Sequence, residues 1–324
     1  MCVIEMAVTD LVDWVLDKTV VPGYSRIGPR IRRSWWPADP APDSLLGKRV
    51  LITGATSGIG MAAAARVAAL GATVHLLGRD SERTERSARE VRAAVPDARV
   101  ETEQCDVANL ADVRSFSAQF ASRVDHLHGL LHNAGVMNST RQETEEGHEV
   151  ALATHVLGPF LLTRLLRDVL AADGDARVIF MSSGGMYAGA IHPDDFEYRS
   201  GTYSATTAYA RTKRMQVVLA ELLAEHLRTA GIAVHSMHPG WVDTPGVRSH
   251  LPRFRALTRP LLRDNAGGAD TLVWLTSAPE ASRSTGLFWH DRRARPTSFG
   301  PSSNETEHQR TALWEMCRST TESP

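Results

Sequence analysis

Tyr209 and Lys213 are the pair of side chains in this sequence that could most readily transfer a proton. They lie four residues apart near the start of an amphipathic helix predicted over 208–227, so they share one helix face. A phenol has a pKa of about 10, and a neighbouring ammonium would lower that pKa toward the range that suits proton exchange at neutral pH. Taken alone, the same spacing is also found on an ordinary surface turn of helix.

Ser183 supplies a hydroxyl just beyond a strand predicted over 177–181. A hydroxyl at this point can hydrogen-bond a substrate carbonyl as negative charge builds on the carbonyl oxygen. Ser183, Tyr209 and Lys213 together therefore indicate acid–base chemistry at a carbonyl or an alcohol.

A glycine-rich turn, Gly54-x3-Gly58-x-Gly60, follows the first predicted strand and opens the next helix. Gly54 can make the tight turn, and Gly58 and Gly60 let the backbone approach a pyrophosphate. The helix N-terminus adds unpaired N–H groups and a positive dipole. The turn therefore predicts a dinucleotide site, although an ordinary strand-to-helix turn would also use glycines.

The end of the second predicted strand, Gly78-Arg79-Asp80, bears on which dinucleotide is bound. An acidic residue there would hydrogen-bond a free ribose 2′-hydroxyl, whereas an arginine would pair with a 2′-phosphate. Arg79 stands directly at the strand end, which favours NADP(H) and leaves NAD(H) as the other choice. Alternatively, Arg79 is merely solvated and Asp80 caps the helix predicted over 81–94.

Strand and helix patterns alternate along most of the chain, which predicts an α/β fold. We expect a single Rossmann-type doubly wound parallel sheet with helices on both faces, plus an N-terminal helical arm. The expected units are the arm (1–46), a catalytic domain (47–296) and a C-terminal tail (297–324). The strands are predicted over 49–52, 73–77, 99–104, 127–131, 177–181 and 232–237, and the helices over 61–70, 81–94, 110–122, 150–170 and 208–227.

The arm and the tail each differ from the central pattern. The arm has a short helical pattern over 11–16, followed by the basic and tryptophan-containing run 30–36 and a proline-rich link. It is either a peripheral membrane contact or a helix folded back on the catalytic body. The tail is polar, with one short helical piece near 311–317, and we expect it to be partly loose.

Composition excludes several classes of protein. The chain has 324 residues, with 36 Lys and Arg against 37 Asp and Glu, a balance that argues against a dedicated nucleic-acid binder. Cys2, Cys105 and Cys317 are far apart, so we expect neither a disulfide framework nor a thiolate metal site. No secretory leader or membrane-spanning run is recognised, and a cytoplasmic location, with membrane association left open, is expected.

At this point the chain resembles the short-chain dehydrogenase/reductase family, over roughly 47–290. The matching motifs occur in the family's order: the glycine turn, Asp106-Val107, Asn133-Ala134-Gly135, Ser183, Tyr209-x3-Lys213, and Pro239-Gly240 followed by Thr244. The stretches 182–186 and 237–247 are most similar to the branch called dehydrogenase/reductase SDR family member 12. The long Ser183-to-Tyr209 spacing is similar to that of retinol-dehydrogenase-like members.

The resemblance implies an NADP(H)-dependent oxidoreductase that interconverts a carbonyl and an alcohol. Tyr209 would be the general acid and base, Lys213 would lower its pKa and hold the nicotinamide ribose, and Ser183 would orient the carbonyl. A small-molecule substrate and a homo-oligomer are also implied. The cofactor-binding residues would be Gly54, Thr56, Ser57, Gly58, Ile59, Gly60, Arg79, Asp106, Val107, Asn133, Ala134, Gly135, Tyr209, Lys213, Pro239, Gly240, Val242 and Thr244.

One position departs from the family pattern. The family usually has an asparagine three residues before Gly158, where it supports a proton relay to the lysine, and this chain has His155. Histidine can also hydrogen-bond and carry protons, so His155 joins the catalytic candidates. The exchange preserves the relay, alters its pH response, or marks a catalytically weak protein that senses the cofactor or acts as a scaffold.

Other chemistries are less well supported. His126, His128 and His132 would share one face of a strand, but packing histidines explain them better than a metal site, and no metal is expected. An epimerase or dehydratase of the extended branch of the family would space its glycines as Gly-x2-Gly-x2-Gly, unlike Gly54, Gly58 and Gly60 here. The stretches 192–207 and 241–265 are expected to select the substrate, and nearby apolar residues indicate a lipophilic one.

Overall fold

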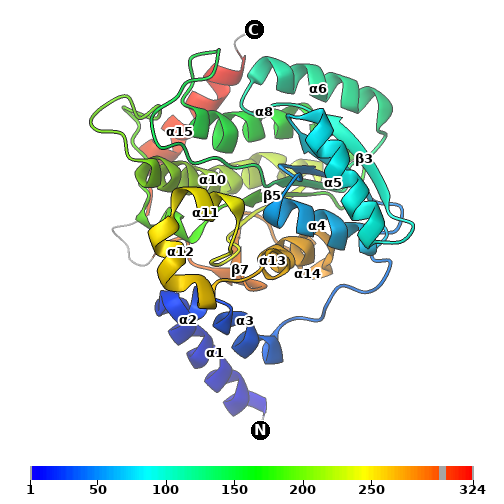
Figure 1. The fold of residues 1–324 in the computed structure, drawn as a ribbon, viewed down its shortest axis with the longest axis vertical. Helices are drawn as coiled ribbons and strands as arrows, with labels where there is room; N and C mark the ends of the chain where they lie inside the picture. The colour runs from blue at the N-terminus through cyan, green and yellow to red at the C-terminus, as the bar shows by residue number, and fades with distance from the viewer. Residues whose placement is uncertain (1, 299–303, 323–324) are drawn as a thin grey trace.

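The core of the fold is an eight-stranded sheet, seen in a computed structural model that describes residues 2–298 and 304–322 (Figure 1). The strand order is β3-β2-β1-β4-β5-β6-β7-β8, and every neighbouring pair is parallel except β7 with β8. The order changes direction between β1 and β4, which confirms the doubly wound arrangement. The strands are β1 Arg49–Thr53, β2 Thr73–Gly78, β3 Arg99–Gln104, β4 Gly129–His132, β5 Arg177–Met181, β6 Ala233–Met237, β7 Phe288–His290 and β8 Arg293–Arg295.

Helices cover both faces of the sheet. Leu51 of β1 enters one apolar cluster while its neighbours Val50 and Ile52 enter the other, so the strand is buried on both sides. One cluster is closed by α4 Gly58–Ala69, α5 Ser81–Ala94 and α13 Asn265–Ser277, and the other by α6 Leu110–Arg123, α8 Gly158–Leu165 and α10 Ala205–Leu227. The shorter helices are α7 Val150–Leu152, α9 Arg167–Ala171, η3 Gly184–Ala188, η4 Arg228–Ala230, α11 Pro245–His250, α12 Pro252–Thr258, η5 Arg259–Leu261 and α14 Pro279–Ser282.

The segment 150–170 is not the single helix that the sequence predicts. It divides into α7, a π-helical turn η2 (Ala153–Leu157), α8 and α9. A Cβ on Gly158 would lie 1.8 Å from the carbonyl oxygen of Val107, so two backbone segments pass in close contact where the π-helical turn meets α8. We attribute the irregular turn to this close approach.

Much of the C-terminal tail is a helix packed against the rest of the protein, whereas 299–303 and 323–324 lie outside the described residues. The predicted piece 311–317 lies inside a longer helix, α15 (Glu307–Glu322). Leu313 and Cys317 are buried in the same apolar cluster as α8 and α10. The ring of Trp314 stacks on that of His226 at 3.7 Å and meets the edge of Phe160 at 5.3 Å. These contacts anchor the helix although its surface is polar.

The N-terminal arm is joined to the domain by buried ion pairs. It comprises α1 Cys2–Lys18, α2 Val20–Tyr24, α3 Ile27–Arg32 and η1 Arg33–Trp35. Arg32 contacts Asp13 and Asp291 at 2.7 Å each, and Arg263 contacts Asp291 at 2.6 Å. Arg295 of β8 contacts Asp13 at 2.6 Å. Each of the two aspartates therefore contacts two arginines at the interface between the arm and the β7–β8 turn, and we call these five residues the arm cluster.

We expect Asp291→Asn to lower the free energy of unfolding by about 3–5 kcal/mol, because the buried guanidinium groups of Arg32 and Arg263 lose the charge that compensates them. Asparagine is similar in size and tolerates the left-handed backbone of this position, where φ is 50°. Urea denaturation measures the change. Glu315→Gln, which removes the exposed 2.7 Å pair with Arg318, is the matched control and should leave stability unchanged. Equal stability of both variants would contradict a structural role for the cluster.

Candidate active site

The candidate acid–base residues meet where β5 ends against the first turns of α10. Ser182 Oγ donates a 2.8 Å hydrogen bond to the carbonyl oxygen of Lys213, which fixes the helix to the strand end. Ser204 caps α10 by accepting a hydrogen bond from the Thr207 N–H. The capped helix presents Tyr209 and Lys213 on one face, and Ser183 follows β5 directly.

Burial dominates the acidity of Tyr209. It raises the pKa of the phenol above its usual value, and a hydrogen bond with Ser183 lowers the pKa only in part. The net direction is upward, and Lys213 is not among its causes, so the lowering of the Tyr209 pKa by Lys213 stays a prediction. A phenol with a raised pKa keeps its proton at neutral pH, and Tyr209 is therefore poised to donate one.

Lys213 is buried and satisfied by oxygen acceptors other than the phenol. Its Nζ lies 5.4 Å from the centre of the Tyr209 ring and donates to the carbonyl oxygen of Met181 at 2.8 Å and to Oε1 of Gln216 at 2.9 Å. Burial lowers the pKa of Lys213 to about 7. This side chain therefore changes its charge in the neutral pH range, unlike an exposed lysine.

His155 is engaged away from Lys213. Its Nε2 accepts a 3.0 Å hydrogen bond from the Val136 N–H, so Nδ1 carries the proton and donates to Oγ1 of Thr212 at 2.8 Å. Burial, together with the charge of Lys213, holds the pKa of His155 well below its usual value. The neutral imidazole thus links the backbone of Val136 to Thr212 on α10. Its ring makes no hydrogen bond to Lys213.

Gln216 makes the connection that the sequence assigned to residue 155. Its Nε2 donates to the backbone carbonyl oxygen of His155 at 2.9 Å, and its Oε1 accepts from Lys213. Gln216 is fully buried. The prediction from sequence motifs did not include Gln216, although its place three residues after Lys213 puts it on the same helix face. The amide thus bridges the lysine to the π-helical turn.

The glycine turn is shaped by backbone that approaches it from β4. A Cβ on Gly54, where φ is 64°, would lie 2.7 Å from Cα of Ala134, and one on Gly60 would lie 2.3 Å from Nδ2 of Asn133. Nδ2 of Asn133 donates to the carbonyl oxygens of Thr53 and Gly54, at 3.0 and 3.1 Å. Asn133 and Ala134 therefore hold the turn in a shape that side chains would destroy.

The mouth of this turn fits a pyrophosphate. Ser57 stands at the N-cap of α4 without capping it through its side chain, so the helix terminus keeps its positive end available for an anion. Gly58 faces the loop that follows β6, because a Cβ there would lie 3.6 Å from Cδ of Pro245 and 4.0 Å from Cγ2 of Thr244. The strand ends, the helix terminus and this loop lie together at the edge of the sheet where the sequence predicts that a dinucleotide binds.

The other predicted cofactor residues lie along the same edge of the sheet. Arg79 is exposed at the end of β2, while Asp80 caps α5 by accepting from the Arg83 N–H at 2.9 Å. Asp106 accepts from the Ala108 N–H. A Cβ added at Gly135 would lie 3.3 Å from Nε2 of His155. Thr56 and Ile59 are half-buried, and Val107 is buried. The remaining residues follow β6 and are Pro239, Gly240, Val242 and Thr244.

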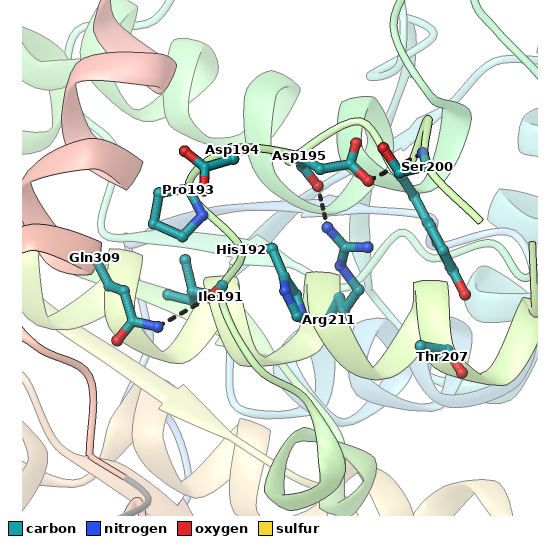
Figure 2. A pocket seen from close by; sticks show the side chains of 10 residues that line it. Ile191, His192, Pro193, Asp194, Asp195, Ser200, Thr207, Arg211 and Gln309 are labelled. Atoms are coloured by element: carbon teal, nitrogen blue, oxygen red, sulfur yellow. Dashed lines mark hydrogen bonds between the residues drawn. The ribbon is translucent and has the colours of Figure 1, made fainter.

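One cavity lies between the loop before α10 and the helix face that carries Thr207 and Arg211 (Figure 2). It holds about 640 Å³ and is lined from the loop 191–200 and from Thr207, Arg211 and Gln309. Thr207 and Arg211 occupy one helix face, and Tyr209 and Lys213 occupy the other. The first part of the stretch expected to select the substrate therefore lines a cavity that does not include Tyr209.

The histidines that could suggest a metal site have hydrogen-bond partners instead. His128 contacts Asp173 at 2.8 Å and the carbonyl oxygen of Thr276 at 3.0 Å, and His132 contacts Oγ1 of Thr163 at 2.8 Å. Across residues 2–298 and 304–322, no three histidine, cysteine or acidic residues are arranged to hold a metal ion.

The lysine titration offers a direct test of the bridge, because the chain has only three lysines. We expect the NMR signal of Lys213 in protein labelled with ¹³C-lysine to titrate near pH 7. Gln216→Ala should lower that pKa, since the ammonium loses an acceptor, and Gln216→Glu should raise it by adding negative charge. Lys213→Arg assigns the signal, and Lys18 and Lys48 serve as internal references. Unchanged titration in both variants would contradict the bridging role.

Comparison with known proteins identifies the family. The short chain dehydrogenase family matches residues 48–253. The chain is 40% identical over 255 residues to dehydrogenase/reductase SDR family member 12 of Bos taurus, covering 78% of each chain. It is also 40% identical over 261 residues to a Streptomyces sp. (strain C5) protein described as a daunorubicin C-13 ketoreductase, covering 80% of this chain and 88% of that one. Among solved structures, 3-ketoacyl-(acyl-carrier-protein) reductase of Brucella melitensis complexed with NADH has a TM-score of 0.61 at 26% identity, covering 75% and 96%. The protein belongs to the short-chain dehydrogenase/reductase family and is an NAD(P)-dependent oxidoreductase.

Proposed function

We propose that the protein is an NADP(H)-dependent reductase of lipophilic carbonyl compounds, able to run in reverse as an alcohol dehydrogenase. The observation that carries this proposal is the placement of the Tyr209 phenol beside Ser183 at the end of β5, with Nζ of Lys213 5.4 Å from the centre of its ring; the raised pKa of the phenol keeps it protonated at neutral pH. A protonated phenol is the form that a reduction needs, because the carbonyl oxygen must gain a proton as it becomes a hydroxyl. The ketoreductase name of the Streptomyces relative supports the same reaction class.

Each residue has a distinct part in the proposed reaction. Ser183 would hydrogen-bond the substrate oxygen and hold it within reach of the Tyr209 hydroxyl. Lys213, held by Met181 and Gln216, would contact the cofactor ribose and could replace the proton that Tyr209 gives up. The nicotinamide, when bound, supplies or accepts the hydride. Asn133 keeps the glycine turn open for the pyrophosphate.

The cofactor preference rests on the end of β2. Asp80 is already used as the cap of α5, so its carboxylate is engaged by backbone N–H, whereas the exposed Arg79 has no ion pair among the described residues. An exposed guanidinium at this strand end suits a 2′-phosphate. We therefore retain NADP(H) as the preferred cofactor and NAD(H) as the alternative.

The surroundings of the site favour an apolar substrate. Buried Met186 and half-buried Tyr187 follow Ser183, and Trp241 leads into α11 and α12, with its ring 5.1 Å from that of Phe254. Asp243 ties these two helices together through Arg248 and Arg255, at 3.2 and 2.7 Å. We propose that the pair of helices forms a lid over the catalytic domain, 47–296. Self-association and a cytoplasmic location stay predictions.

We expect Arg79→Ala to weaken NADPH binding by roughly 10- to 100-fold, the value of a charge-assisted hydrogen bond to phosphate, and to leave NADH binding unchanged. Titration calorimetry with each cofactor measures both affinities. Arg86→Ala, which removes another exposed arginine on α5, is the control. If the two variants behave alike, the assignment of Arg79 to the 2′-phosphate is wrong.

We expect purified protein to reduce members of a panel of lipophilic ketones and aldehydes, and Tyr209→Phe to lower kcat by about 100-fold or more while still binding NADPH. Alcohol oxidation by the native protein should rise with pH, because it needs the phenolate and the pKa of Tyr209 is raised. Reduction should not show that rise. NADPH binding without turnover of any panel member would instead favour the cofactor-sensing alternative.

A further inference from the structure

The first helix of the arm, α1, turns its apolar side chains outward and buries acidic ones, whereas an ordinary surface helix does the opposite. Val8, Leu11, Val12 and Val15 recur at helical spacing and all are exposed, with Leu11 62% and the adjoining Trp14 58% accessible. The face turned toward the protein carries two carboxylates instead. In Figure 1, α1 projects from one end of the molecule, and the exposure of these side chains shows that no other described part of the chain covers them.

The orientation of α1 is fixed by charge. Asp13 and Asp17 are buried beneath the helix with Leu16. Asp13 contacts Arg32 at 2.7 Å and Arg295 at 2.6 Å. Turning the apolar face inward would break these buried pairs, leaving the Arg295 guanidinium without its carboxylate partners and Arg32 with Asp291 alone. The ion pairs therefore hold the apolar side chains outward.

The charges around this face have one sign. Residues 18–36 include five basic residues and no acidic residue. Lys18, Arg26, Arg30 and Arg33 are exposed, whereas Arg32 is buried in the arm cluster. The one exposed acidic side chain of α1 beyond residue 7, Asp10, is paired with Arg293 at 2.7 Å. The exposed charge of the arm over 18–36 is thus positive, which complements anionic lipid headgroups.

We propose that the outward face of the arm, formed by Val8, Leu11, Val12, Trp14 and Val15 with the basic border of Lys18, Arg26, Arg30 and Arg33, docks on the surface of a membrane that contains anionic lipids. A tryptophan on an apolar helix face with basic residues beside it suits the boundary between headgroups and acyl chains. Within the described ranges, no helix is long and apolar enough to cross a bilayer. The arm would therefore lie in the plane of the interface.

The docking face continues toward the lid of the proposed active site. The Arg26 N–H donates a 2.9 Å hydrogen bond to the carbonyl oxygen of Leu261, in the turn that follows α12. On α12, Leu257 is 84% accessible and Arg253 is exposed. Figure 1 shows α12 directly beside α2. Leu257 and Arg253 could thus reach the same membrane surface as the arm.

Vesicle flotation of the full chain tests this proposal independently of catalysis. The protein should float with phosphatidylcholine vesicles that contain phosphatidylserine, and less with phosphatidylcholine alone. Leu11→Ser with Trp14→Ser should weaken binding by roughly tenfold or more, since both exposed apolar side chains are lost. Arg26→Glu with Arg30→Glu should abolish the preference for anionic vesicles and its salt dependence.

Leu46→Ser is the matched control, because Leu46 is 64% accessible but lies outside the arm face. It should bind vesicles as the native chain does. NADPH titration and thermal unfolding establish that every variant is folded. No binding by the native chain, or equal loss in the Leu46 variant, would overturn the proposal. The proposal would also be overturned if the native chain did not bind vesicles but formed a dimer in analytical ultracentrifugation, and if that dimer dissociated in the Leu11 and Trp14 variant.

Discussion

The burial of an ammonium and a phenol on one helix face is the constraint on which the rest of the site depends. Neither charged form is favoured in this environment, so the pKa of Lys213 falls to about 7 while that of Tyr209 rises. The two pKa values, which are nearly equal for the free side chains, therefore move apart. The Lys213 ammonium is then the stronger acid of the pair, so proton transfer from Lys213 to a Tyr209 phenolate is favourable.

Such a pair can be tolerated only if its polar atoms have partners. Lys213 donates hydrogen bonds to the carbonyl oxygen of Met181, at the end of β5, and to the side-chain amide oxygen of Gln216, on α10. Ser182, which follows β5, also links the strand to α10, because its hydroxyl donates to the backbone carbonyl oxygen of Lys213. The strand-to-helix junction is therefore a polar network inside an apolar core, in which each bond limits the motion of the next.

Local patterns in the sequence were sufficient for much of the fold. The helix over 81–94 and the strands over 99–104 and 177–181 have the predicted limits, because caps and apolar runs mark their ends. The motifs also singled out Ser183, Tyr209 and Lys213, which the structure brings to one strand-to-helix junction. These features depend on residues within one or two turns of each other, or on a short signature.

Features that depend on distant contacts could not be predicted in the same way. The arm cluster joins Arg32 to Asp291, 259 positions later, and neither residue belongs to a recognisable motif. The direction of the Tyr209 pKa shift follows from burial by surrounding elements, which spacing alone does not reveal. Gln216 has no role until β5, η2 and α10 are brought together. Two short strands, β7 and β8, were missed because three residues give too little pattern.

The arm is coupled to the site through Tyr24. Its ring lies 4.5 Å from that of His238, and a Cβ on Gly184 would come within 2.8 Å of the Tyr24 ring. Gly184 follows Ser183, so the arm packs against the residue next to the candidate substrate-orienting hydroxyl. Arg263, at the end of the lid segment, donates to the carbonyl oxygens of Tyr24 and Ser25 at 3.1 and 3.2 Å. Because the interior is close-packed, a displacement of the arm must shift both the lid end and the Ser183 turn.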